Sequence, residues 1–543
     1  MRRLAVLCAA AVAALAAPAA ATALPPSWTD ATYFNDASQP AADPYVLHDA
    51  ATGYYYAYST DGAGPGYHFG VYRSADLATW ERMPGGALPA DDPDQWGNDW
   101  FWAPEVYRNP RTGWYFLFYA ARSDANKQRW FGYAGFEEPC KIGVAVSRSP
   151  AGPFRNISDQ PIGFNPYDPD YHDVNLLMGP DQRTPPATLA EGEKAPLGTY
   201  IPTIDPDVLF DGGRMYLYVS RNAYRNWNWD TDLGKYVEES NIIAVPLTTA
   251  WWSDPAARTM PSIAPAYQGA NDRPGGPAGP RRDGYVTVLD YGHDKQPWEN
   301  ADVNDYALSN GQKKDRRWEE GSSILRAGST YYLTYSANNW ETPQYGVGYA
   351  TSSSPLGPFK KAAANPILHQ DPAIGMYSTG HGSIAASPDG SELYYVHHGR
   401  PSPGTEQRRL YTERMRLAGG QLSIEQSTGD EPIPSGVAPY RLRASARALV
   451  LRSGSERRLR WRVTSADGAE LALANPLNRV DAAAPGAAVE LQGSGPDGVT
   501  VAARSPGRTT ITLTYQRRLA AGGYRDVAGA RGPVSVRIPV VVR

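Results

Sequence analysis

Three carboxylates open similar short motifs at widely separated places in the chain. They are Asp43, Asp205 and Glu320, in the segments Asp43-Pro44-Tyr45-Val46, Asp205-Pro206-Asp207-Val208 and Glu320-Gly321-Ser322-Ser323-Ile324. Two further segments have the same layout without a carboxylate at the start: Ala103-Pro104-Glu105-Val106 and His381-Gly382-Ser383-Ile384. Each of these motifs leads through a turn into an aromatic-rich segment such as Tyr54–Tyr58. The carboxylates therefore hold equivalent places in a recurring unit.

Carboxyl groups gathered at one place could perform acid–base chemistry. One protonated carboxyl can donate a proton to a leaving oxygen while an ionised one activates water. A third carboxylate nearby raises the pKa of the acid by like-charge repulsion. Each residue alone is more simply explained as turn chemistry, because Asp-Pro and Glu-Gly pairs are common in turns. Their recurrence at equivalent positions favours a shared site.

The recurring unit also predicts the fold. A second pattern follows several motifs, in which a strand ends in Ser and a turn leads to Trp or Phe, as in Gly70–Ser74 before Trp80. Such a unit suits a four-stranded antiparallel blade, and five β units are usually closed radially. We therefore expect an all-β five-bladed β-propeller over residues 24–432, with the three carboxylates at its centre.

The composition changes near Ile433-Pro434-Ser435-Gly436, from Tyr and Trp to Ala, Arg, Val and Leu. Segments with alternating polarity follow, such as Leu459–Val463 and Thr510–Tyr515. About seven short strands in a segment of this length are typical of a sandwich. We expect an immunoglobulin-like β-sandwich over residues 437–543, with no recognisable site.

The first residues predict export. Met1-Arg2-Arg3 is basic, Leu4 to Ala20 is apolar, and Ala21-Thr22-Ala23 has small residues suited to cleavage. This is the pattern of a secretory signal peptide over residues 1–23, so we expect a bacterial extracellular or periplasmic protein. Cys8 would leave with the signal, and Cys140 would remain as an unpaired, buried side chain.

Charge excludes two classes of partner. The chain has 52 Lys and Arg against 56 Asp and Glu, a net charge of −4. This balance gives no electrostatic case for nucleic acid or an anionic membrane. No later segment is long and apolar enough for membrane insertion. We expect a monomer with no nucleic-acid partner and no membrane insertion.

Together the motifs resemble glycoside hydrolase family 43, the five-bladed propeller family of arabinanases, α-L-arabinofuranosidases and β-xylosidases. The resemblance covers about residues 30 to 420. It rests on Ala42-Asp43-Pro44, Trp102-Ala103-Pro104-Glu105-Val106, Ile204-Asp205-Pro206, Glu320-Gly321 and Gly380-His381-Gly382-Ser383. It implies an inverting glycosidase for arabinose- or xylose-containing plant polysaccharides. Asp43 would be the general base, Glu320 the general acid and Asp205 the modulator of the acid's pKa, with base and acid about 6.5–9.5 Å apart.

The resemblance also implies secondary site residues. His381 would bind substrate or, with waters, a calcium ion on the propeller axis. Trp102 and Arg400 would contact the sugar. Glu319 is a rival for Glu320, but neighbours on a strand face opposite ways and the family's Glu-Gly pair selects Glu320. Ser322 departs from the commoner Glu-Gly-Pro form.

Two alternatives stay open. The same fold without chemistry would be a carbohydrate-binding propeller, although that reading predicts the loss of at least one carboxylate. A retaining enzyme for fructans would want a Trp-x-Asn-Asp-Pro motif, where this chain has only Ala42-Asp43-Pro44.

Overall fold

A computed structural model describes most of the chain between Thr32 and Arg543. The described residues are 32–34, 39–77, 80–131, 134–163, 176–177, 184–194, 202–221, 226–267, 285–304, 315–372, 375–404, 407–426, 430–432, 434, 440–464, 470–474, 478–518, 523–529 and 532–543. The predicted signal peptide, residues 1–23, lies outside them. Within this part of the chain no helix is long and apolar enough to cross a membrane.

The protein is all-β, as predicted. Among the described residues before the C-terminal sheets, three separate sheets have four strands each, and in each of them sequential strands pair antiparallel. Their strands are β2 (Tyr45–Asp49), β3 (Tyr54–Ser59), β5 (Gly70–Ser74) and β6 (Trp80–Arg82); β8 (Asp99–Arg108), β9 (Tyr115–Arg122), β10 (Cys140–Ser147) and β11 (Arg155–Asn156); and β22 (Tyr377–Ala386), β23 (Leu393–Arg400), β24 (Arg409–Ala418) and β25 (Gln421–Glu425).

The middle of the chain forms one sheet of ten strands. It contains two four-stranded groups: β13 (Ile204–Asp211), β14 (Arg214–Arg221), β16 (Lys235–Leu247) and β17 (Val286–Leu289), then β18 (Arg316–Ala327), β19 (Thr330–Ala337), β20 (Gly346–Ser352) and β21 (Lys360–Lys361). A parallel pairing of β16 with β18 joins the groups. A hairpin-like extension adds β15 (Asn226–Asp230) and β12 (Leu176–Leu177).

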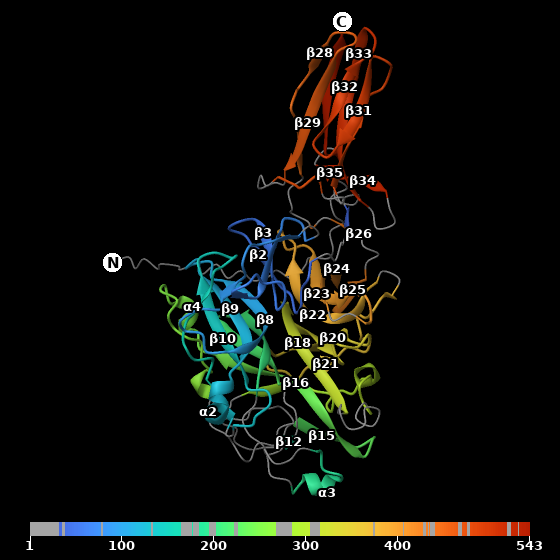
Figure 1. The fold of residues 1–543 in the computed structure, drawn as a ribbon. Coiled ribbons are helices and arrows are strands. Elements are labelled where there is room, and N and C mark those ends of the chain that lie inside the picture. Colours follow the sequence, from blue (N-terminus) through green and yellow to red (C-terminus); the bar gives the residue numbers. More distant parts are fainter. Residues whose placement is uncertain are drawn as a thin grey trace, which may run out of the picture.

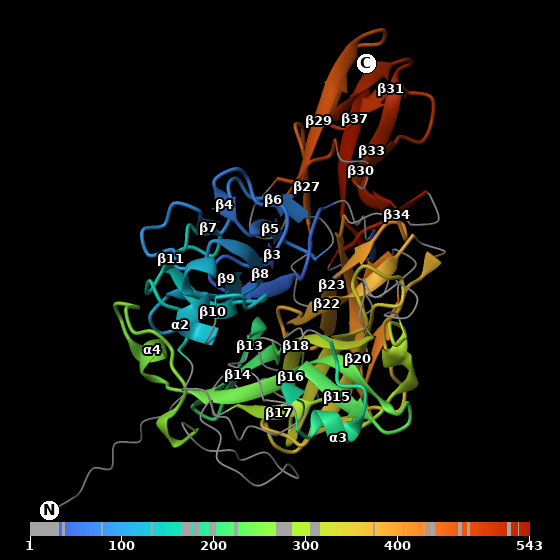
Figure 2. The same cartoon turned by 60° about the horizontal axis from the view of Figure 1, so that its bottom comes forward.

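The first strands of these five groups form a closed circuit. β2 contacts β8, β8 contacts β13, β13 contacts β18, β18 contacts β22, and β22 contacts β2 again. Figures 1 and 2 show the groups following one another around a common centre, from blue through green to orange. Segments that are far apart in the sequence between Tyr45 and Ala386 are therefore brought together.

Hydrophobic side chains on both faces of the second strands explain why the groups stack. In β9, Phe116, Phe118 and Ala120 belong to one buried cluster. Leu117 and Tyr119, which alternate with them, belong to another. Successive side chains of a strand point to opposite faces, so an unbroken hydrophobic run indicates a strand covered on both sides.

Short elements fill the connections. The strands β1 (Thr32–Phe34) and β26 (Asp430–Pro432) pair with each other, as do β4 (Tyr67–His68) and β7 (Leu88–Pro89). The short helices are η1 (Asp124–Asn126), α2 (Lys127–Phe131), α3 (Leu189–Gly192), α4 (Ala250–Ser253), η2 (Pro265–Tyr267) and η3 (Pro297–Asn300).

The C-terminal residues form two sheets that share one buried cluster. One contains β27 (Arg441–Ala444), β29 (Glu456–Thr464), β32 (Gly498–Ala503) and β31 (Val489–Gly495). The other contains β28 (Leu449–Leu451), β37 (Ser535–Val542), β33 (Gly507–Arg518), β30 (Asn478–Ala483) and β34 (Tyr524–Asp526), and a small pair is formed by β35 (Ala528–Gly529) and β36 (Gly532–Pro533). These strands project from the rest of the molecule (Figure 1).

A buried polar contact ties the C-terminal sheets to the first sheet. Arg517 Nη2 lies 2.8 Å from Asp76 Oδ2. The Tyr440 hydroxyl donates to the same carboxylate. Asp76 and Arg517 are both almost fully buried, so the contact is shielded from water.

Candidate active site

An unusual backbone conformation recurs within, or just before, each of the five first strands. The φ angles are positive at Asp43 (50°), Ala103 (47°), Asp205 (54°), Gly321 (60°) and His381 (39°). In β8, β13, β18 and β22 the pairing register shifts at this point. Such bulges redirect a side chain, and left-handed non-glycine residues persist only where the surrounding structure holds them. The recurrence therefore aims side chains at one central place.

Glu320 stands one position earlier than the other two carboxylates in this pattern. Gly321, not Glu320, takes the left-handed position that Asp43 and Asp205 occupy. A Cβ atom on Gly321 would lie 2.7 Å from His381 Cγ. The approach of the imidazole therefore leaves no room for a side chain here, and the left-handed conformation favours glycine as well.

Asp43 lies among cationic and polar groups. Arg408 Nη1 is 3.0 Å from its Oδ1 atom, and the Thr60 hydroxyl donates to Oδ2 at 2.7 Å. Its Oδ1 is also 3.2 Å from His381 Nδ1 and 3.4 Å from His398 Nδ1. Burial alone would raise the pKa of Asp43, but the charges of Arg408 and His381 and the contact with His398 hold that pKa well below its usual value. Asp43 is therefore ionised, as a general base must be.

Asp205 accepts two hydrogen bonds through one oxygen. The Ser220 hydroxyl donates to Oδ2 at 2.8 Å, and the backbone N–H of Gly321 donates to it at 3.3 Å. The second bond connects Asp205 to the residue that follows Glu320. Burial raises the pKa of Asp205, and repulsion from Asp43 adds to this, while His381 and the two hydrogen bonds oppose it.

Glu320 is buried and has the opposite protonation tendency to Asp43. The Tyr345 hydroxyl donates to Glu320 Oε1 at 2.7 Å. Burial raises the pKa of Glu320 to about 8, and repulsion from Asp205 contributes. The carboxyl is therefore protonated near neutral pH and is able to donate.

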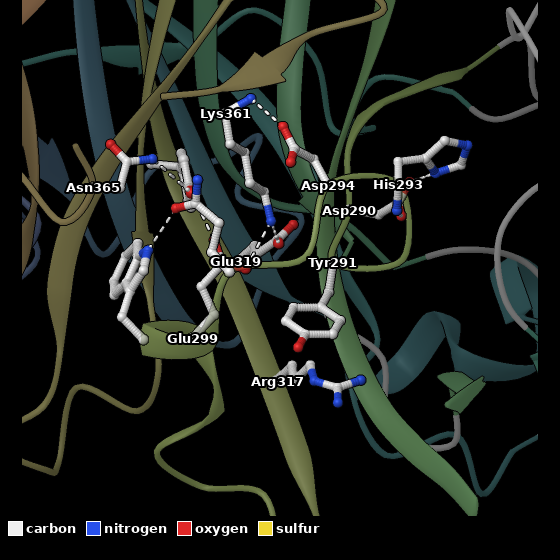
Figure 3. A network of polar contacts seen from close by, with 12 residues as sticks. Asp290, Tyr291, His293, Asp294, Glu299, Arg317, Glu319, Lys361 and Asn365 are labelled. Atoms are coloured by element: carbon white, nitrogen blue, oxygen red, sulfur yellow. Dashed lines mark hydrogen bonds and ion pairs between the residues drawn. The ribbon is translucent and has the colours of Figure 1, made fainter. Parts of the chain in front are cut away.

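Glu319 lies on the other side of the strand. Its Oε1 atom is 2.6 Å from Lys361 Nζ, and the same amine is 2.7 Å from Glu299 Oε2. All three side chains are buried behind β18, and Figure 3 shows them converging there. Glu319 therefore takes part in an ion-pair network, whereas Glu320 faces the other carboxylates.

His381 lies between the carboxylates. Its backbone N–H donates to Ser336 Oγ at 2.7 Å, and its charge opposes the upward shifts in the pKa of both Asp205 and Glu320. Calcium prefers six to eight oxygen ligands. Among the described residues no group of three or more His, Cys, Asp or Glu side chains could hold a metal. His381 with its described neighbours is therefore not a protein-built cation cage.

Trp102 lies in β8, and Arg400 is the last residue of β23. The indole of Trp102 stacks on that of Trp100 with centroids 4.9 Å apart. The next residue, Ala103, donates its N–H to Thr60 Oγ1, which itself bonds Asp43. Arg400 is buried, with its guanidinium 5.9 Å from the Trp340 ring and donating to the Glu341 carbonyl.

Sequence reasoning missed the partners that set the protonation states. Arg408, His398, Thr60 and Tyr345 all contact a predicted catalytic carboxylate. None stands in one of the five motifs. Arg408 and Tyr345 each stand directly before the third strand of their groups, β24 and β20, a place that the repeat could have pointed to.

A second pair of acids lies next to the site. The Tyr107 hydroxyl donates to Glu105 and lies 3.3 Å from Asp207 Oδ1. Burial raises the pKa of Glu105, with repulsion from Asp207 adding to it, and burial raises the pKa of Asp207 to about 7. This pair shares its buried environment with Tyr45, and the charge of Asp205 adds to the rise in the pKa of Glu105.

The geometry can now be set beside known proteins. The model of "Glycosyl hydrolases family 43" matches residues 37–177 and 291–419. The chain belongs to this family. Asp43 and Glu320 lie within the two matched segments, and Asp205 lies between these segments.

This family 43 protein is also similar to individual proteins of known sequence or known structure. Residues of the chain are 41% identical over 81 positions to a protein named beta-D-galactofuranosidase xynD from Aspergillus niger, a match that spans 15% of this chain and 23% of that protein. A thermostable family-43 glycoside hydrolase is 25% identical with a TM-score of 0.49, covering 74% of this chain and 99% of that one. An endo-1,4-beta-xylanase from Bacteroides thetaiotaomicron is 26% identical with a TM-score of 0.47, covering 74% and 97%.

Proposed function

We propose that this family 43 protein is a secreted, inverting glycoside hydrolase that cleaves arabinose- or xylose-containing plant polysaccharides or oligosaccharides. The observation that carries the proposal is the opposite protonation of two carboxyls in one site. Arg408 and two histidines keep Asp43 ionised. Burial and Asp205 raise the pKa of Glu320 to about 8 and keep it protonated.

These protonation states give each carboxyl a role in the hydrolysis of the glycosidic bond. Asp43 removes a proton from water, which attacks the anomeric carbon from one face of the sugar. Glu320 donates its proton to the glycosidic oxygen as the bond to the leaving group breaks. The water oxygen ends on the sugar with inverted configuration, and the leaving sugar carries the proton of Glu320. Asp205 acts on Glu320 through charge and through its bond to the Gly321 N–H.

The closed circuit of first strands supports five blades around this site. The shared cluster of the two C-terminal sheets supports a sandwich of immunoglobulin-like type. We extend the proposal to the boundaries 24–432 and 437–543, to a signal peptide over residues 1–23 and to a monomer. An axial calcium at His381, with mainly water ligands, is a further proposal that a melting curve with and without EDTA tests.

A second substrate class has a specific observation in its favour. The relative matched at 41% identity is named a beta-D-galactofuranosidase, and the match spans 23% of its length. A furanose is also the ring form of arabinofuranosides, so one pocket could accept either sugar. β-D-Galactofuranosides therefore belong among the substrates tested.

Product analysis tests the proposal. The purified mature protein is incubated with linear arabinan, arabinoxylan, xylan and the aryl glycosides of arabinofuranose, xylopyranose and galactofuranose. Sugar release that Asp43→Ala abolishes, with the product of inverted anomeric configuration by proton NMR, supports the assignment. A folded protein that binds these sugars without release would be a carbohydrate-binding propeller instead.

A further inference from the structure

Side chains of β18 alternate between two environments just before the general acid. Arg317 Nη1 lies 3.2 Å from Glu239 Oε1, and Arg317 also pairs with Asp230. Glu319 pairs with Lys361. Both odd-numbered side chains are buried in the network of Figure 3, on the packed side of the strand.

The even-numbered side chains consequently occupy the opposite face. Pairing is regular across this stretch, with Trp318 opposite Ser240, and with Glu319 and Glu320 opposite Ala337 and Ser336. The Asn338 N–H donates to the Trp318 carbonyl at 3.1 Å. In a regular strand, residues two apart share a face. Trp318 thus lies on the same face as Glu320, about 7 Å along the strand.

β18 is buried continuously from Glu319 to Ser323, so Trp318 stands just outside this buried stretch. Its indole is only half-buried. Arg316 shares this face, and its guanidinium carbon lies 5.6 Å from the Trp318 ring centroid. The Arg316 Nε atom is buried and has no hydrogen-bond partner within the described part of the chain.

These groups suit one part of a glycoside. The general acid protonates the glycosidic oxygen, so the leaving-group sugar must extend from Glu320 away from the buried Asp205. A half-exposed indole offers a flat apolar surface for the C–H face of a sugar ring. The Arg316 side chain is itself only half-buried, and the N–H groups of a guanidinium donate to hydroxyl oxygens.

We propose that Trp318 and Arg316 form the binding site for the leaving-group sugar. Trp318 stacks on its ring and Arg316 donates to one of its hydroxyls. The inference rests on the proposed function, because it takes Glu320 as the general acid. It makes the two residues determinants of specificity for the leaving group and gives them no part in proton transfer.

Two substrates with the same glycone separate this role from catalysis. One is the disaccharide that the wild type cleaves best among arabinobiose, xylobiose and a galactofuranosyl disaccharide. The other is the glycosyl fluoride of the same sugar and anomer, whose leaving group is a single atom. Trp318→Ala should lower kcat/KM for the disaccharide about 10- to 100-fold, in the range of a lost substrate contact. Hydrolysis of the fluoride should stay within about twofold, because no ring stacks on Trp318 in that substrate.

Controls keep the result interpretable. Trp252→Ala removes another half-buried indole, on α4, which packs against Phe116 and Phe210 and should leave both rates unchanged. If Trp318→Ala folds poorly, Trp318→Phe takes its place in the test. This variant keeps a flat ring and should retain much of the disaccharide activity. Arg316→Gln should weaken the disaccharide reaction selectively as well.

Equal loss on both substrates, or no loss on the disaccharide, would overturn the leaving-group site while leaving the glycosidase assignment intact. A wild-type protein that hydrolyses neither the fluorides nor the disaccharides would overturn the proposed function itself. The two failures are therefore distinguishable.

Discussion

Arg408 Nη1 lies 3.0 Å from Asp43 Oδ1, although 365 residues separate them in the chain. The guanidinium also lies 4.5 Å from the ring of Trp340, which fixes its plane beside the carboxylate. This contact opposes the rise in the pKa of Asp43 that burial would otherwise cause. The protonation state of the proposed base thus depends on a residue that directly precedes β24, in the last of the five groups of strands.

Arg408→Ala should move the acidic limb of the pH profile upward. Without the cation, burial dominates and the pKa of Asp43 rises, so the base becomes protonated at a higher pH. The measurement is kcat/KM against pH on an aryl glycoside. An unchanged acidic limb would show that Arg408 does not control Asp43.

Glu320→Gln should abolish proton donation without unfolding the protein. The amide cannot protonate a leaving oxygen, so turnover of natural glycosides should fall about 10²- to 10⁴-fold. Glycosyl fluorides, which leave without a proton, should be hydrolysed far better relative to wild type than disaccharides are. Thermal melting serves as the folding control. Full activity on disaccharides would remove the acid assignment.

Asp205→Asn should move the alkaline limb downward. In the native protein the pKa of Glu320 is about 8, raised by burial and then by Asp205. Removing the negative charge lowers that pKa, so the acid loses its proton at a lower pH and activity falls earlier as pH rises. The asparagine oxygen is able to accept the bonds from Ser220 and the Gly321 N–H. A limb that stays near pH 8 would contradict the modulating role.

Lys361→Met should destabilise the fold strongly. The buried amine lies between Glu299 and Glu319, which would be left as uncompensated buried carboxylates. Removing one partner of such a network typically lowers the free energy of unfolding by about 3–5 kcal/mol. The matched control is Lys360→Met, at the exposed neighbouring position. Urea denaturation of the two variants gives the comparison, and equal midpoints would refute the structural role.

The recurring unit and its carboxylates could be predicted from the sequence. Side chains along a strand alternate with a period of two, and the motifs stand at similar places in each unit. The aromatic runs such as Tyr115–Tyr119 predicted buried strands, and the all-β class followed. The Glu-Gly pair selected Glu320 over Glu319 by resemblance. The predicted roles of Trp102, His381 and Arg400 remain predictions, since the geometry places them without testing them.

Other features of the structure could not be predicted from local sequence patterns. The parallel joining of β16 to β18, which merges two groups into one sheet, depends on residues far apart in sequence. The single-residue offset of Glu320 relative to Asp43 and Asp205 appears only in the backbone angles.

The sequence by itself determined which residue types stand at the start of each recurring unit, because strand period and turn chemistry are local properties. Only the tertiary structure decided which of those carboxyls is ionised. Burial, the approach of Arg408 to Asp43 and the approach of Asp205 to Glu320 are long-range, and electrostatic energy depends on distance and solvent exposure rather than on position along the chain.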